Sequence, residues 1–198
     1  NSQCSAQHLL QFAVMGSVVA SDMHGIERPR IGLLNIGEEE SKGDSVVQEA
    51  ARLLSASSLN YIGFVEGDDI FSGDVDVVVT DGFTGNVVTK ALEGTVKLVV
   101  GEISAAARKN PLSAAGGLLL KPALGGLRHD LHPDTTGGAI LLGLRKTAVV
   151  GHGSSGADGV ANAIRLGARS ARVDAPGLTE EMLHRVGVNW GSIDSGTD

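Results

Sequence analysis

Residues 28–65 read RPRIGLLNIGEEESKGDSVVQEAARLLSASSLNYIGFV, and the fold class follows from the pattern of this stretch. Its apolar runs at 31–36 and 61–65 are typical of buried strands, and 45–58 has the spacing of an amphipathic helix. Ser45 and Gln48 match a capping box at the start of that helix. Continuous apolar strands that alternate with helices predict a mostly parallel sheet covered by helices.

The same alternation continues on both sides of this stretch. Residues 6–25 are apolar nearly all round, which predicts a buried helix that stops at Gly25. The further expected elements are a strand at 75–80, a helix from about 86 to 108, strands within 138–143 and 147–150, and a helix at 156–170 with Ser155 and Asp158 as a second capping box. We therefore expect an α/β fold, an α/β/α sandwich with a mostly parallel sheet.

Residues 110–138 differ in texture, because they are rich in Gly, Leu and Pro. They predict either a long loop or a helical excursion that is broken at Pro122. Such a segment can lie in a membrane interface with its cations at headgroup level, or it can pack at a dimer contact. The residues expected at this tip are Leu118, Leu119, Leu120, Leu124 and Leu127, beside Lys121 and Arg128.

We expect residues 1–175 to form one domain that carries this excursion, and 176–198 to form a weak helix and a polar tail. The net charge of −7 disfavours broad nucleic-acid binding, and the 3% aromatic content disfavours base stacking.

Cys4 is the only cysteine, so no intrachain disulfide is possible and a cytoplasmic protein is the default. No continuous apolar run reaches the length of about 18–20 residues that a membrane span needs. No metal-binding motif occurs, and no cofactor is expected.

Four of the expected strands end in unusual loops, which read NIGEEESKGD, VEGDDIF, TDGFTGN and GHGSSG. Ligands of open parallel α/β sheets bind beyond the carboxyl ends of the strands. If these strands are parallel, all four loops lie at one edge of the sheet. Helices follow several of the loops, so their free backbone N–H groups predict a place for a phosphate or a developing oxyanion.

The candidate site residues come from three of these loops. His152, Gly153, Ser154 and Ser155 combine a small backbone with two hydroxyls at a helix start, which suits an anion. The other candidates are Asp81, Gly82, Gly85, Asn86 and Lys90 from the TDGFTGN region, and Asn35, Glu38 and Lys42 from NIGEEESKGD. The plainer alternatives stay open: a solvated charge run, an ordinary turn, a structural histidine and a surface lysine.

The segments HLLQFAVMG, RPRIGLLNIGEEESKG, YIGFVEGDDIFSGDVDVVVTDGFTGNVVTKALEG, LLLKPAL, GGAILLG and HGSS occur in this order. Together they resemble the PlsX family, the phosphate acyltransferases of bacterial phospholipid synthesis, and the resemblance covers roughly residues 1–171. It implies a fold similar to that of phosphate acetyltransferases and the isocitrate-dehydrogenase-like group. It also implies a homodimer in the cytoplasm, associated peripherally with the membrane, and that this chain is the C-terminal part of the enzyme.

In that family, inorganic phosphate attacks the thioester of a fatty acyl–acyl carrier protein, and a membrane glycerol-3-phosphate acyltransferase then uses the acyl phosphate. The resemblance implies a site that holds phosphate beside the thioester and supplies oxyanion donors, each worth about 3 kcal/mol. Two alternatives remain open: a phosphate acetyl- or butyryltransferase that acts on acyl-CoA, or a non-catalytic fragment that dimerises or binds carrier protein or membrane. The apolar tip and NIGEEE favour the lipid enzyme.

Overall fold

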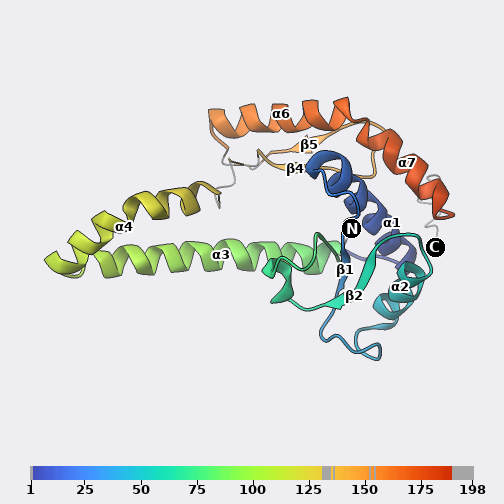
Figure 1. Cartoon of the computed structure of the whole chain (residues 1–198), viewed down its shortest axis with the longest axis horizontal. Coiled ribbons are helices and arrows are strands. Elements are labelled where there is room, and N and C mark those ends of the chain that lie inside the picture. The colour runs from blue at the N-terminus through green and yellow to red at the C-terminus, as the bar shows by residue number, and fades with distance from the viewer. Residues whose placement is uncertain (1, 131–134, 136, 152, 154, 189–198) are drawn as a thin grey trace. The chain divides into compact units, whose positions relative to one another are not determined.

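The computed structural model describes residues 2–130, 135, 137–151, 153 and 155–188, with the side chains of 121–130 left out. Figure 1 shows the elements in chain order. They are α1 (Ala6–Val18), the π-helix η1 (Val19–Met23), β1 (Ile31–Leu34), α2 (Ser45–Ser55), β2 (Tyr61–Val65), the 3-10 helix η2 (Asp69–Phe71), β3 (Val77–Val79), α3 (Gly82–Ala107), α4 (Pro111–Asp130), β4 (Ala139–Ile140), β5 (Val149–Val150), α6 (Ala157–Arg172) and α7 (Ala175–Arg185).

Three strands form a parallel sheet in the order β2-β1-β3, which confirms the predicted α/β class. In the register of the sheet, Leu33 of β1 pairs with Phe64 on one side and with Val79 on the other. The chain leaves β1 for one neighbour and then crosses to the strand on the opposite side. This reversal places a topological switch point between the carboxyl ends of β1 and β3, where ligands of such sheets bind.

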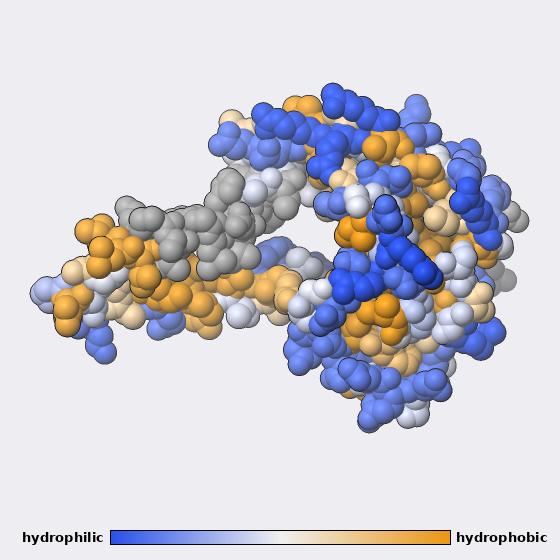
Figure 2. Space-filling model, in the orientation of Figure 1, coloured by the Kyte–Doolittle hydropathy of each residue, from blue (hydrophilic) through white to orange (hydrophobic). Residues whose placement is uncertain are grey.

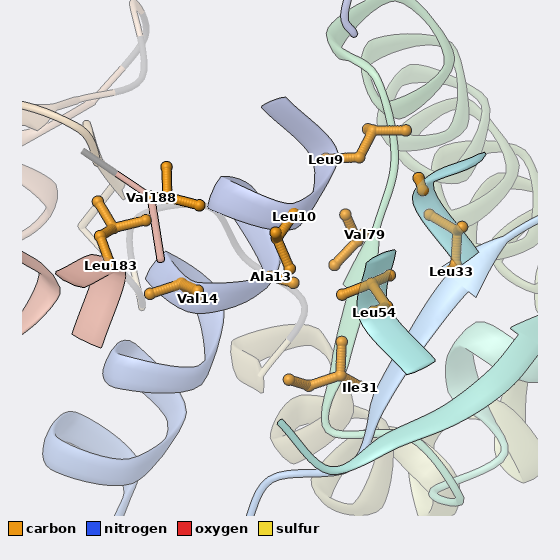
Figure 3. Close-up of a cluster of buried hydrophobic side chains, with 11 residues drawn as sticks. Leu9, Leu10, Ala13, Val14, Ile31, Leu33, Leu54, Val79, Leu183 and Val188 are labelled. Atoms are coloured by element: carbon orange, nitrogen blue, oxygen red, sulfur yellow. The ribbon is translucent and has the colours of Figure 1, made fainter. Parts of the chain in front are cut away.

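The core of the sheet lies under two helices. Helix α1 packs on α2 and on β3, and α2 packs on β2, so the two helices cover one face. Figure 3 shows side chains from α1, β1, α2, β3 and α7 that converge in this core. Ile31, Leu33 and Leu54 are fully buried, and burial of each such side chain contributes about 1.5–3 kcal/mol to the free energy of folding. Gly16 lets α1 approach the sheet, since a Cβ atom there would lie 2.5 Å from Cγ1 of Val77.

The first helix ends as the sequence predicts, although its last turn is a π-helix. Gly25 has φ +73°, a left-handed conformation that costs glycine little, and its N–H group donates to the carbonyl oxygen of Ser21. The guanidinium group of Arg169 donates to the carbonyl oxygen of Met23. The widened turn therefore has partners for its carbonyl groups from both the backbone and a side chain.

Two predictions for the middle of the chain need correction. Helix α3 begins at Gly82, four residues before the expected start, because Asp81 caps its first turn. Residues 111–130 form one helix, so the helical alternative holds and Pro122 does not end it. Pro122 has no N–H group to donate, so the helix lacks one backbone hydrogen bond at this residue. The glycine-rich composition concealed this helix.

Helix α3 buries none of its side chains. Leu92, Val99 and Ile103 recur at helical spacing on α3, yet all three are exposed. Leu118, Leu119 and Leu120 of α4 are exposed to 70%, 82% and 57%. Figure 2 shows hydrophobic residues spread along these two helices. The side chains of Leu124 and Leu127 lie outside the part that the structure describes.

The strands predicted within 138–143 and 147–150 are short, and they form a sheet of their own, β4-β5. Two glycines pack here without room for a side chain. A Cβ atom on Gly137 would lie 2.3 Å from the backbone nitrogen of Ala163, and one on Gly138 would lie 2.2 Å from the carbonyl oxygen of Val150. Both glycines also have positive φ angles, so the conformation and the space each require glycine.

The chain divides into two compact units, one of residues 1–85, 140–148 and 167–198 and the other of residues 86–139 and 149–166. The first holds the three-stranded sheet, and the second holds most of α3 with α4 and most of α6. The predicted division into 1–175 and 176–198 stays a prediction. Among the described helices, none is both long and apolar enough to cross a membrane.

Candidate active site

Three of the four predicted loops share one edge of a sheet. The loops after β1, β2 and β3 leave the carboxyl ends of three parallel, neighbouring strands. The fourth loop, 151–156, follows β5, which belongs to the separate two-stranded sheet. The expectation that one sheet aligns all four loops is therefore wrong for the GHGSSG loop, because β5 is no strand of the parallel sheet.

Asp81 caps helix α3 at the end of β3. Its Oδ1 atom accepts hydrogen bonds from the backbone N–H groups of Phe83 and Thr84, at 2.8 and 2.9 Å. Its Oδ2 atom accepts a hydrogen bond from the hydroxyl of Thr84, at 2.5 Å. Both carboxylate oxygens are thus engaged within the first turn of the helix. Gly85 packs closely on the residue that follows β3, since a Cβ atom there would lie 3.1 Å from Cγ2 of Thr80.

The environment of Asp81 favours the ionised carboxylate. Partial burial raises its pKa, but the hydrogen bonds from Thr84 and Phe83 outweigh this effect and the pKa is lowered. A carboxylate at a helix start is also stabilised by the helix dipole. Asp81 is therefore a charged helix cap, a poor proton donor near neutral pH.

Helix α2 is capped in a similar way, and this corrects the predicted capping box. Asp44, not Ser45, is the N-cap, and its Oδ1 atom accepts from the N–H groups of Val46 and Val47, both at 2.9 Å. The side chain of Gln48 instead donates to the carbonyl oxygens of Ser41 and Gly43. Two first-turn N–H groups of α2 and two of α3 are thus taken by carboxylates, so fewer of these groups are free for an anion than the sequence suggested.

The loop after β1 carries three predicted site residues. Asn35 is buried, and its Nδ2 atom donates to the carbonyl oxygen of Gly37 at 3.1 Å. Glu38 and Lys42 are exposed at the same edge of the sheet. The loop after β2 is a turn, in which Asp69 accepts from the N–H group of Glu66 at 2.8 Å. The plainer interpretation of VEGDD as a turn is therefore confirmed.

Asn86 and Lys90 are exposed residues one turn apart on α3. The Nζ atom of Lys90 lies 2.9 Å from both carboxylate oxygens of Glu93. This i,i+3 ion pair on an exposed helix is worth only a few tenths of a kcal/mol, so a stronger anion can displace Glu93. Both residues stay candidates for ligand binding.

The GHGSSG loop is described only in part. His152 and Ser154 lie outside the described residues. The hydroxyl oxygen of Ser155 is buried and has no hydrogen-bond partner among the described residues. The predicted capping box of Ser155 and Asp158 is therefore not formed, since its serine must accept a backbone hydrogen bond. Ser155 is left with an unused donor at the start of α6.

Sequence reasoning did not name three residues as parts of this edge, although it placed one of them, Gln48, in a helix cap. They are Thr84, whose hydroxyl bonds Asp81, Gln48, which reaches back into the loop after β1, and Gly43, whose φ is +87°. A signal existed for the cap itself, because an Asp that directly follows a strand and precedes a helical repeat is a preferred N-cap residue. Among the described residues, no group of three or more His, Cys, Asp and Glu could hold a metal ion.

Comparison with known proteins places these features in a family. The model of the family described as fatty acid synthesis protein matches residues 1–176. The chain belongs to this family. The resemblance to PlsX that the motifs carry is thereby confirmed.

Curated relatives of the fatty acid synthesis protein family agree with the match. A phosphate acyltransferase of Elusimicrobium minutum is 47% identical over 169 residues, which are 85% of this chain and 50% of the relative. Phosphate acyltransferases of Pseudomonas fluorescens Pf-5 and Pseudoalteromonas atlantica are each 48% identical, over 92% and 93% of this chain and 56% and 54% of the relatives. The chain spans about half the length of the curated relatives that it matches.

Proposed function

We propose that the protein carrying this chain transfers a fatty acyl group from acyl–acyl carrier protein to inorganic phosphate. The observation that carries the proposal is the family match over residues 1–176, with curated relatives named phosphate acyltransferase. In the reaction, a phosphate oxygen attacks the carbonyl carbon of the thioester. The carbon–sulfur bond breaks, the acyl phosphate leaves, and the thiolate of the carrier takes up a proton.

We propose separate roles for the candidate residues. His152, Ser154 and Ser155 bind phosphate or the developing oxyanion, with Gly153 allowing close approach. The buried hydroxyl of Ser155 supports this role, since it has no hydrogen-bond partner in the part of the chain that the structure describes and can donate to an anion. Asn86 and Lys90 of α3 contribute a neutral donor and a cation, and Lys90 exchanges Glu93 for the ligand.

Residues at the carboxyl edge of the parallel sheet are the other candidates in our proposal. Asp81, Gly82 and Gly85 set the start of α3, so we propose that Asp81 positions the helix rather than moving a proton. Glu38 and Lys42 are exposed at this edge and are proposed to orient the acyl substrate. No covalent enzyme intermediate is needed, because positioning and oxyanion stabilisation are sufficient for attack on a thioester.

The exposed leucines of α4 support a second part of the proposal, a homodimer that contacts the membrane peripherally from the cytoplasm. Leu118, Leu119 and Leu120 are all more than half exposed. An apolar segment of this kind gains free energy when it enters a bilayer interface or packs against a second copy. A membrane location also places the acyl phosphate near a glycerol-3-phosphate acyltransferase, the proposed consumer of the product.

The proposal is tested with the full-length protein and purified substrates. Acyl–acyl carrier protein and radiolabelled phosphate are expected to give labelled acyl phosphate, which is extracted into organic solvent and counted. Acyl-CoA offered at the same concentration distinguishes the acyl-CoA enzyme, which would use it in preference. A folded full-length protein that uses neither thioester would support the non-catalytic alternative and contradict the proposal.

A further inference from the structure

Asn35 sits at the point where β1 ends and the acidic loop begins. Its backbone N–H group donates to the carbonyl oxygen of Val65 at 2.9 Å, which extends the ladder between β1 and β2 by one residue. Only 8% of the residue is exposed. The side chain thus starts from a fixed backbone position and is directed into the loop 36–43.

The amide of Asn35 is held between two parts of that loop. Its Nδ2 atom donates to the carbonyl oxygen of Gly37, at 3.1 Å. Its Oδ1 atom lies so near Gly43 that a Cβ atom there would be only 2.6 Å away. Gly43 also has φ +87°, so both its conformation and its contact with Asn35 call for glycine.

The rest of the loop folds around this contact. The N–H group of Lys42 donates to the carbonyl oxygen of Glu39 at 2.9 Å, which closes a tight turn. A Cβ atom on the buried Gly37 would lie 2.8 Å from Oε2 of Glu39 and 3.1 Å from Cγ of Lys42. Gln48 adds hydrogen bonds to two further loop carbonyls from its exposed position on α2. Asn35 is buried, whereas the side chains of Glu39, Lys42 and Gln48 are exposed.

We infer that Asn35 is a positioning residue, which locks the loop 36–43 in one conformation and thereby places Glu38 and Lys42 at the edge of the sheet. Its Nδ2 atom already donates inside the loop and the residue is buried, so we place its action on the loop and not on the substrate. The sequence alone suggested Asn35 as a ligand-binding residue, and the geometry assigns it this indirect role. The catalytic consequence rests on the proposed function, because it requires that the loop faces the reacting groups.

Loss of the Asn35 side-chain contacts is expected to make the loop 36–43 more mobile and to leave the rest of the fold intact. Without the amide, the carbonyl group of Gly37 loses its donor and the contact with Gly43 becomes empty space. The strands keep their own backbone hydrogen bonds. Small errors in the position of binding groups lower rates by up to about a hundredfold, so a local change is enough to affect turnover.

The test compares Asn35→Ala with Asn60→Ala in the full-length protein. Asn60 is a matched control, because its Nδ2 atom also donates to a loop carbonyl, that of Arg28 at 3.1 Å, but beside the amino end of β2. Amide hydrogen exchange of residues 36–43 is expected to accelerate about tenfold or more in Asn35→Ala and to stay unchanged in Asn60→Ala. If Asn35→Ala does not fold, Asn35→Ser is measured, since serine is polar but too short to reach Gly37.

Steady-state kinetics give the second readout. Partial unfolding lowers the apparent kcat by removing active molecules, but it leaves KM unchanged. A released loop is expected to raise the KM for phosphate or for the acyl thioester by about tenfold in Asn35→Ala, with both KM values unchanged in Asn60→Ala. Unchanged exchange in the loop, or faster exchange with both KM values unchanged, would overturn the inference. An inactive wild-type protein would contradict the proposed function instead, and the exchange rates would still decide whether Asn35 locks the loop.

Discussion

The hydroxyl group of Thr84 donates a 2.5 Å hydrogen bond to the carboxylate of Asp81, while the N–H group of Thr84 donates to the other oxygen of the same carboxylate. This double contact starts helix α3 directly after β3. The sequence suggested a loop at TDGFTGN. In the structure this segment is the end of a strand, a helix cap and the first turn of α3. The acid in the motif is consequently a structural anion at the edge of the sheet.

Substitution of Asp81 separates a capping role from a catalytic one. Asp81→Ala is expected to lower the free energy of unfolding by about 1 kcal/mol, because two N–H groups lose their acceptor. Asp81→Asn is expected to retain most of the stability, since asparagine caps helices nearly as well. Urea denaturation measures both. If Asp81→Asn keeps its stability but loses all acyl transfer, Asp81 takes part in the chemistry and the capping account is incomplete.

The paired glycines before β4 give a second prediction. Gly138→Ala is expected to destabilise the protein, because its Cβ atom would overlap the carbonyl oxygen of Val150 and φ is +130°. Gly94→Ala is the matched control, since Gly94 lies inside α3 with open space around it. That variant is expected to stabilise the helix by about 0.5–1 kcal/mol. Thermal unfolding should therefore shift in opposite directions, and a shift in the same direction would contradict the packing described at Gly138.

The ion pair of Arg30 and Asp76 predicts an acid-sensitive contribution to stability. Hydrogen bonds from the side chain of Arg30, and then from its backbone, lower the pKa of Asp76 from an ordinary 3.8 to about 2. A lowered pKa in the folded state means that the contribution is fully present above the unfolded-state pKa and is lost as the pH falls through the folded-state value. The difference in unfolding free energy between wild type and Asp76→Asn should be constant from pH 7 to 5 and should shrink from about pH 4 to 2.

The control for this pH dependence is Glu49→Gln. Glu49 pairs with Arg52 within the exposed surface of α2, so its removal is expected to change stability little at any pH. A difference between wild type and Asp76→Asn that does not depend on pH would show that the contact acts through shape and not through charge.

The exposed leucines of α4 are tested by vesicle flotation. Leu119→Glu combined with Leu120→Glu is expected to abolish flotation with anionic vesicles, because charged side chains do not enter the acyl region. Ile164→Glu is the control, since Ile164 is similarly exposed on α6. Unchanged flotation of the double variant would remove the membrane role from the proposal and would leave the dimer contact as the explanation for the exposed leucines.

The sequence predicted the strand and helix types well where local patterns dominate. β2 has the predicted bounds, and α2 begins at the predicted residue, because an apolar run and an amphipathic repeat each have one simple solution. The caps were harder to predict. Asp44 and Ser45 are both good N-cap residues, and only the backbone conformation selects Asp44.

Long-range arrangement was the other source of error. The apolar run at 147–150 predicted a strand, but periodicity cannot say which sheet a strand joins. The partner of β5 is β4, and the loop with His152 was therefore assigned to the wrong sheet. Asn35 illustrates the same limit, since its contact with Gly43 depends on how the loop folds back. The sequence suggested a ligand-binding asparagine, and the fold shows that its amide is used within the loop.

The most direct test of the account is the stoichiometry of the reaction catalysed by the full-length protein. Purified protein, acyl–acyl carrier protein and radiolabelled phosphate are incubated together, and free carrier thiol and extracted labelled acyl phosphate are both quantified. The account predicts equal amounts of the two products and no thiol release when phosphate is omitted. Thiol release that continues without phosphate would identify a thioesterase, and no release from a folded protein would contradict the proposed acyl transfer.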